Sequence, residues 1–158
     1  MENNDNIFLA VKAVIVGLCG AFGAAFGWLG WLVLAWVICM IVDYISGSAA
    51  AMQAGQWASA QARAGIWHKA GMIVVVIVAA LADYVLALVA SNIPTLPITY
   101  TVLILPVVLV WYILTELGSI LENAAAMGAP VPEFLTKLLA AAREKVDDVA
   151  TGDTSSKE

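Results

Sequence analysis

Four long runs of apolar residues dominate the chain, at residues 7–26, 28–47, 71–90 and 98–117. A bilayer core about 30 Å thick needs roughly 20 helical residues at 1.5 Å each, so each run is long enough to cross it. Lys12 is the one basic residue inside a run. The pattern predicts an all-α integral membrane protein with about four transmembrane helices.

Prolines mark the later part of this pattern. Pro94 and Pro97 lie in the short link between the third and fourth runs, where they can end a helix without interrupting a span. Pro106 lies inside the fourth run, so we expect it to kink that helix unless neighbouring helices satisfy the freed carbonyl.

The first run has a second interpretation, as a cleaved signal peptide. Its start is acidic, with Glu2 and Asp5, whereas signal peptides begin with a basic region. The run is also longer than the usual apolar core of a signal peptide. We therefore interpret it as a true membrane span.

The C-terminal part has a different pattern. Helical character continues to Met127 and breaks at residues 128–132, which contain one glycine and two prolines. From Glu133 to Asp148 apolar residues recur at helical spacing opposite charged ones, which predicts an amphipathic cytoplasmic helix on the membrane surface or against a neighbour. The predicted parts are a four-helix membrane domain, this amphipathic helix and a small, polar, disordered tail, at residues 1–126, 127–150 and 151–158.

The distribution of lysine and arginine predicts the orientation. With four spans, both termini and the connection at residues 50–70 share one side of the membrane. The turn at Gly27 and the link at residues 91–97, on the other side, contain no charge. Because basic residues favour the cytoplasmic side, we expect both termini to be cytoplasmic. The basic residues on that side are Arg63, Lys69, Lys137, Arg143, Lys145 and Lys157.

Composition agrees with a membrane protein and argues against several other classes. Of 158 residues, 63% are hydrophobic and 12% charged, about half the charged fraction of a typical globular domain. The net charge of -5 offers no basic surface for nucleic acid, so no such partner is expected. Cys19 and Cys39 lie in apolar runs, which argues against a disulfide-stapled fold. With a single histidine, His68, and no catalytic motif, we expect neither an enzyme nor a bound cofactor or metal.

The first two runs contain five glycines at spacings of three and four residues. This spacing keeps them near one helical face, and a smooth glycine face lets helices approach closely in lipid. One interpretation is a seam between copies of the chain, and the other is packing within one monomer. The glycines are Gly17, Gly20, Gly23, Gly27 and Gly30.

Six polar residues lie within or beside the spans. Asp83, roughly 18 Å into the third run, is the most costly, because a charge near the bilayer centre costs about 2.5 to 3.5 kcal/mol. It either faces water in an assembly or forms structural hydrogen bonds between helices. The other five occur near the cytoplasmic interface, where a polar stripe on a helix also suits headgroup contact: Asp43, Glu116, Ser119, Glu122 and Asn123.

Several segments together resemble the phage holins of the toxin-secretion and phage-lysis type. They are Asp43-Tyr44-Ile45-Ser46-Gly47, a small-residue stretch with Ser59 and Gly65, then Lys69 and Asp83, the segment Glu116-Leu117-Gly118-Ser119-Ile120-Leu121-Glu122-Asn123, and finally Gly128, Pro130 and Pro132. The resemblance covers roughly residues 30–140. The chain has fewer basic residues in the connecting stretch than that family, and its glycine-rich first span is not a family feature.

The resemblance implies a protein that accumulates in the inner membrane of an infected bacterium, assembles with copies of itself and opens lesions. A phage endolysin would then reach the cell wall without contacting the protein directly. The implied partners are the lipid bilayer and further copies of the chain. Two other functions also suit four spans with a deep acid: a small proton-coupled transporter of the multidrug type, and a passive membrane scaffold.

Overall fold

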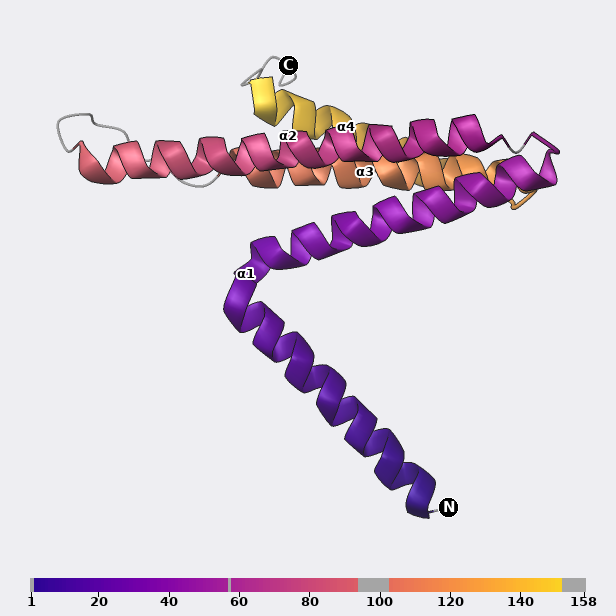
Figure 1. Cartoon of the computed structure of the whole chain (residues 1–158), viewed down its shortest axis with the longest axis horizontal. Helices are drawn as coiled ribbons and strands as arrows, with labels where there is room; N and C mark the ends of the chain where they lie inside the picture. The colour runs from indigo at the N-terminus through magenta and orange to yellow at the C-terminus, as the bar shows by residue number, and fades with distance from the viewer. Residues whose placement is uncertain (1, 57, 94–102, 152–158) are drawn as a thin grey trace. The chain divides into compact units, whose positions relative to one another are not determined.

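The computed structural model describes residues 2–56, 58–93 and 103–151, and all regular structure there is α-helical (Figure 1). The helices are α1 (Glu2–Gln53), α2 (Ser59–Asn92), α3 (Ile104–Ala126) and α4 (Glu133–Thr151). The chain divides into two compact units, Met1–Leu34 and Ala35–Glu158. The predicted disordered tail lies almost entirely outside the described residues.

Three helices in the described part of the chain are long and apolar enough to cross a membrane, at Lys12–Gln53, Arg63–Asn92 and Ile104–Ala126. The all-helical membrane fold is therefore confirmed, but the structure has three such helices where we expected about four. The difference arises in α1, which joins the first two apolar runs. No proline separates the runs, and their residues on both sides are compatible with a helix.

Gly27 interrupts α1 at the expected junction of the two runs. Its φ of 60° and ψ of -161° are non-helical and lie in a region that is open essentially only to glycine. In the first unit, Phe22 lies 4.9 Å from Phe26 and 5.0 Å from Trp31, measured between ring centroids. A Cβ built on Gly23 would be 3.2 Å from Nε1 of Trp31. The aromatic side chains thus pack on both sides of the break.

The connection between α1 and α2 is much shorter than the expected residues 50–70, because both helices continue beyond their apolar runs. Residues 59–70 contain good helix formers and no proline, so the end of the apolar run does not end the helix. Gly55, with a φ of 67°, ends α1. The N–H groups of Gly55 and Gln56 donate to the carbonyls of Met52 and Ala51, the two bonds of a Schellman cap.

α3 begins at Ile104 rather than at residue 98, and residues 94–102 lie outside the described part. This start places Pro106 in the first turn, where its missing N–H costs no helical hydrogen bond. The expected kink within a longer helix is therefore wrong. At the other end, Gly128 and Ala129 donate to Ala125 and Ala124 and form a second Schellman cap.

The second unit has a small buried core from three helices and a large apolar exterior. α2 and α3 lie side by side in Figure 1. The buried hydrophobic residues are Trp36, Met40, Met72, Val76, Ala79 and Leu109. Outside this core, Val74, Val78 and Leu81 on α2 are 59%, 58% and 56% exposed. Apolar side chains exposed over so much of the surface are suited to lipid rather than water.

α4 begins where the sequence predicts it and packs against α3. Nε1 of Trp111 donates to Oδ1 of Asp147 over 2.8 Å. The guanidinium carbon of Arg143 lies 4.2 Å from the Trp111 ring centroid, which is a cation–π contact. α4 thus contacts a neighbour, one of the two positions expected for it, and its cytoplasmic location stays a prediction.

Candidate functional site

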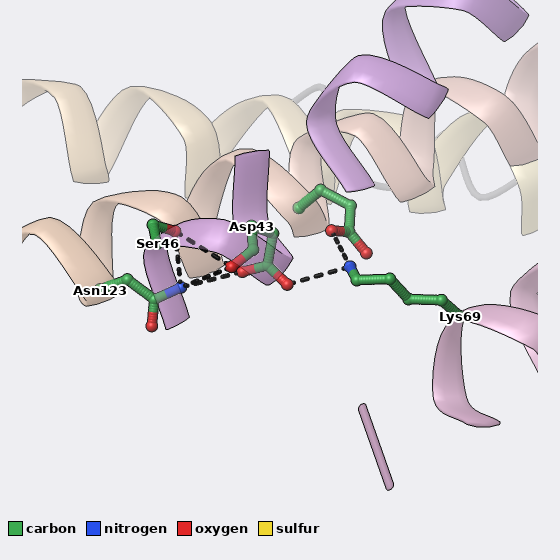
Figure 2. Close-up of polar contacts among 5 residues, drawn as sticks. Asp43, Ser46, Lys69 and Asn123 are labelled. Atoms are coloured by element: carbon green, nitrogen blue, oxygen red, sulfur yellow. Dashed lines mark hydrogen bonds and ion pairs between the residues drawn. The ribbon is translucent and has the colours of Figure 1, made fainter. Parts of the chain in front are cut away.

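An ionic cluster joins three helices in the second unit. Nζ of Lys69 on α2 lies 3.0 Å from Oδ2 of Asp43 on α1 and 2.5 Å from Oε2 of Glu116 on α3. The side chains of Lys69, Asp43 and Glu116 are 15%, 19% and 5% exposed. Figure 2 shows the Lys69 ammonium between two carboxylates. We call these three residues the Lys69 cluster.

A group of hydrogen bonds extends the Lys69 cluster along α1 and α3. Nδ2 of Asn123 donates to Oδ1 of Asp43 over 3.0 Å and to Oγ of Ser46 over 3.1 Å (Figure 2). Gly47 lies so close that an added Cβ would be 3.3 Å from Asn123 Nδ2. Two of the segments noted in the sequence, residues 43–47 and 116–123, therefore contact each other directly.

The Lys69 cluster contains two acids and one base, so it keeps a formal charge of -1 when all three residues are ionised. Removing charges from water is costly, and their attraction offsets this cost only when the partners are close and correctly placed. Lys69 supplies that attraction to both carboxylates. It lies beside the start of the apolar stretch at residues 71–90, which is where a membrane-spanning helix enters its interface.

Asp83 has a different role in the structure, as a cap on the N-terminus of α3. The residue is only 4% exposed. Its Oδ1 accepts hydrogen bonds from the backbone N–H groups of Ile104 at 3.0 Å and Leu103 at 3.4 Å, and its Oδ2 accepts one from Leu105 at 2.7 Å. The carboxylate also lies at the positive end of the α3 helix dipole.

This cap accounts for every N–H group that the start of α3 leaves without a helical partner. An α-helix has four such groups, here at positions 103 to 106. Asp83 accepts from the first three, and Pro106 has no N–H. The next N–H, of Val107, bonds to the Leu103 carbonyl as in any helix. Asp83 lies about 14 residues, or roughly 21 Å, along α2 from Lys69, deep in the apolar stretch, where an unsatisfied N–H costs several kcal/mol.

The structure thus separates the polar residues selected from the sequence. Asp43, Glu116 and Asn123 lie together, Ser119 lines a cavity that Asp43 and Asn123 also line, and Glu122 is exposed. Asp83 forms hydrogen bonds between helices, which is the structural one of the two interpretations given for it. Lys69, the shared partner of Asp43 and Glu116, was expected from the sequence only to mark the cytoplasmic side and to belong to the resemblance, not to pair with the acids. The one feature of the sequence that could have indicated a role for Lys69 was its place among the residues that resemble the holin family.

The glycines of the first unit are also placed differently from one another. A Cβ on Gly30 would overlap Cβ of Phe26, and one on Gly23 would contact Trp31. None of the described side chains lies within 4 Å of a Cβ built on Gly17, Gly20 or Gly27. Packing within the first unit therefore uses Gly23 and Gly30.

Metal ligands are not gathered at these sites. Within residues 2–56, 58–93 and 103–151, no group of three or more His, Cys, Asp or Glu side chains is placed to hold a metal ion.

Comparison with known proteins gives one family and several relatives. The family model described as the bacteriophage holin family matches residues 20–144, which confirms the resemblance. Uncharacterized protein Lin0175 of Listeria innocua is 31% identical over 94% of this chain and 94% of its own length. Uncharacterized protein CPE0383 of Clostridium perfringens is 31% identical over 85% and 92% of the two chains. Lmo0128 of Listeria monocytogenes, also uncharacterized, is 33% identical over 82% and 84%. No solved structure matches the chain significantly.

Proposed function

Because the chain belongs to the bacteriophage holin family, we propose that it assembles in the bacterial inner membrane into lesions that release a phage endolysin. The family match over residues 20–144 is the observation that carries this proposal. Three long apolar helices support the membrane location. In the proposed function the endolysin passes through the lesion and does not bind the protein.

The arrangement of polar groups supports a protein that is harmless when dispersed. In the single chain, Asp83 is bonded to the backbone of α3, and Asp43 and Glu116 are paired with Lys69. Exposed apolar side chains can face lipid meanwhile. We infer that, when copies crowd together, Asp43, Glu116 and Asn123 rotate toward a shared aqueous lining. Water then replaces part of the hydrogen bonding that the monomer supplies internally.

The open glycines provide a place for copies to meet. Lipid gives helices no hydrophobic reason to associate, so their contact depends on close packing of small residues. Gly17 and Gly20 have nothing within 4 Å of a built Cβ, and we assign them the contact between copies. In this proposal the role of the other three glycines is to set the backbone conformation of the segment next to the contact. They are Gly23, Gly27 and Gly30.

The proposed topology has four crossings and cytoplasmic termini. The apolar part of α1 has 42 residues, or about 63 Å of helix, which is about twice the thickness of a bilayer core. The non-helical backbone at Gly27 is a suitable place for the chain to reverse. The two crossings of α1, with one each from α2 and α3, then give four crossings. The basic residues outside the spans lie on the cytoplasmic side. Reporter fusions at both ends test this: activity of a cytoplasmic reporter is expected at each, and a periplasmic signal at either end contradicts it.

Timed expression in bacteria tests the proposed function. We expect normal growth, then an abrupt loss of viability and membrane potential, and earlier death when an uncoupler is added. Moving one charge through 100 mV changes its energy by about 2.3 kcal/mol, so loss of the potential can release charged groups held against it. Co-expressed endolysin should lyse the culture only after this moment. Continued growth with pH-dependent drug efflux would instead show a transporter, and continued growth with no phenotype would show a scaffold.

A matched pair of variants connects this phenotype to the Lys69 cluster. Glu116→Gln removes one carboxylate from Lys69, and Glu122→Gln removes an exposed one from the same helix. We expect the first to shift the time of killing at equal protein level and the second to leave it unchanged. Equal timing for both variants and the parent would remove the cluster from the mechanism.

A further inference from the structure

Two cavities of different character meet beside the Lys69 cluster. The first, of about 360 Å³, has a mixed lining whose polar side chains include Asp43, Ser48, His68 and Ser119. The second, of about 350 Å³, has an apolar lining that includes Val37, Met40, Ile41, Ile45, Ile66 and Ile73. Tyr44 and Lys69 line both. The two cavities therefore adjoin at these two side chains, and we call the pair, with its polar and its apolar end, the amphipathic groove.

The apolar end of the amphipathic groove opens on the outer surface of the second unit. Ile41 on α1 is 54% exposed, and Ile66 and Ile73 on α2 are 54% and 44% exposed. These side chains line the groove and face outward at the same time. In a membrane, a lipid chain can enter the groove from the side without passing through the protein.

The direction of the amphipathic groove matches that of a lipid in the bilayer. Lys69 lies beside the start of the apolar stretch at residues 71–90, at headgroup level. Ile73 lies about one turn, or roughly 6 Å, further along α2. The polar cavity includes Gln56 and Ala58 from the connection between α1 and α2, on the opposite side of Lys69. The polar cavity thus extends toward the interface as far as this connection, and the apolar cavity, whose lining also includes Ile66, extends toward the membrane interior as far as Ile73.

We propose that the amphipathic groove binds one phospholipid with a primary ammonium headgroup. An acyl chain lies against Ile41 and Ile73, and the headgroup lies in the polar cavity. Each cavity is within the range of about 300 to 1,000 Å³ that is usual for ligand sites, and a mostly apolar lining with a few polar groups is typical of them. The proposal depends on the membrane location of the chain and not on lesion formation.

The net charge of the Lys69 cluster favours a headgroup with a primary ammonium. The Lys69 cluster has one more carboxylate than ammonium, so it attracts a cation and disfavours a second anion without a cation beside it. A primary ammonium can donate hydrogen bonds to Asp43 and to Tyr44, whereas a trimethylated one cannot. The phosphate of the same lipid can lie beside Lys69 and the exposed His68. A zwitterionic headgroup thus matches both signs present at the site.

A second copy of the chain is a poorer occupant on the same grounds. Two copies packed through the same face would bring two clusters of formal charge -1 together. Like charges at a desolvated interface oppose association. The apolar end alone could accept a neighbouring helix, but the polar end would then lose its contact with water and gain no partner of opposite charge.

Native mass spectrometry of the full chain, released from detergent with equal amounts of three lipids, tests the proposal. The lipids are phosphatidylethanolamine, phosphatidylcholine and phosphatidylglycerol with identical acyl chains. We expect one bound phosphatidylethanolamine per chain, retained about tenfold more than either other lipid, since a charge-assisted hydrogen bond corresponds to about that factor. Equal retention of the three lipids, or none, would overturn the proposal, as would a dimer that excludes lipid.

Matched variants locate the bound lipid. Ile73→Trp fills the apolar end, whereas Ile77→Trp changes a similarly exposed residue one turn further along α2 that does not line the groove. We expect the first to lose the bound lipid and the second to keep it. Asp43→Asn should keep a lipid but lose the preference for phosphatidylethanolamine over phosphatidylglycerol. Equal binding by the two tryptophan variants would refute the location.

Discussion

Replacement of Asp83 gives the sharpest test of the structure, because one carboxylate supports the whole first turn of α3. Asp83→Leu removes the acceptor for the N–H groups of Ile104 at 3.0 Å and Leu105 at 2.7 Å, together with the longer bond to Leu103. Hydrogen bonds to charged groups contribute about 1.5 to 3 kcal/mol each, so the two shorter bonds account for roughly 3 to 6 kcal/mol.

Asp83→Asn should have a smaller effect on the same turn. The amide oxygen can still accept from Ile104, but the amide nitrogen then faces the N–H of Leu105, so one bond is lost. The expected loss is roughly 1.5 to 3 kcal/mol. The structure therefore predicts that the first turn of α3 is most stable in the parent, less stable in Asp83→Asn and least stable in Asp83→Leu. A water-facing Asp83 predicts nearly equal stability for the three chains.

Amide hydrogen exchange of residues 103–110 in lipid nanodiscs measures this directly. Since 1.4 kcal/mol corresponds to a factor of ten, exchange should accelerate about 10- to 100-fold in Asp83→Asn and at least 100-fold in Asp83→Leu. Glu122→Gln, an exposed acid on the same helix, is the control and should leave residues 103–110 unchanged. Unaltered exchange in Asp83→Leu would refute the capping role.

Three further predictions concern other contacts of the second unit. Lys69→Met leaves Asp43 and Glu116 without their shared cation and should lower the free energy of unfolding in detergent by about 3 kcal/mol; a loss under 0.5 kcal/mol would contradict the pairing. Among the described residues, none accepts a hydrogen bond from the buried Nε1 of Trp36, so Trp36→Phe loses no hydrogen bond and should cost about 1 kcal/mol in thermal unfolding, against about 3 to 5 for Trp36→Ala; a cost above about 2 kcal/mol for Trp36→Phe would contradict this. Asp147→Asn weakens the bond from Trp111 and should expose α4 to protease several-fold faster, a result that a detached α4 would not give.

The sequence alone was enough to predict an all-helical fold and several of the positions where helices end or break. Apolar runs of bilayer length predicted the long membrane-type helices, although about four were expected and the described residues form three, and Gly27 was correctly identified as the junction of the first two runs. The glycine and prolines after Met127 predicted the break before α4, because their backbone preferences are local. These features depend on residues close together in the chain.

Helix ends and long-range partners were less accessible to prediction. The length of an apolar run defines where lipid can cover a helix, and α2 begins twelve residues earlier because its polar first turns remain compatible with a helix. The cap of α3 is supplied by Asp83, about 20 residues earlier in the chain, whereas local capping rules consider only adjacent residues. Lys69 and Glu116 are 47 positions apart, so their pairing follows from the register of α2 against α3, which no local pattern contains.

Leakage from vesicles at increasing protein density tests the central claim most directly. The purified chain is reconstituted at a series of protein-to-lipid ratios in vesicles loaded with a small dye and a labelled enzyme of endolysin size. We expect sealed vesicles at low density and steep release of both cargoes above a threshold, coincident with cross-linking through cysteines placed at Gly17 and Gly20. Retention of both cargoes by a monomeric protein at every density would contradict it.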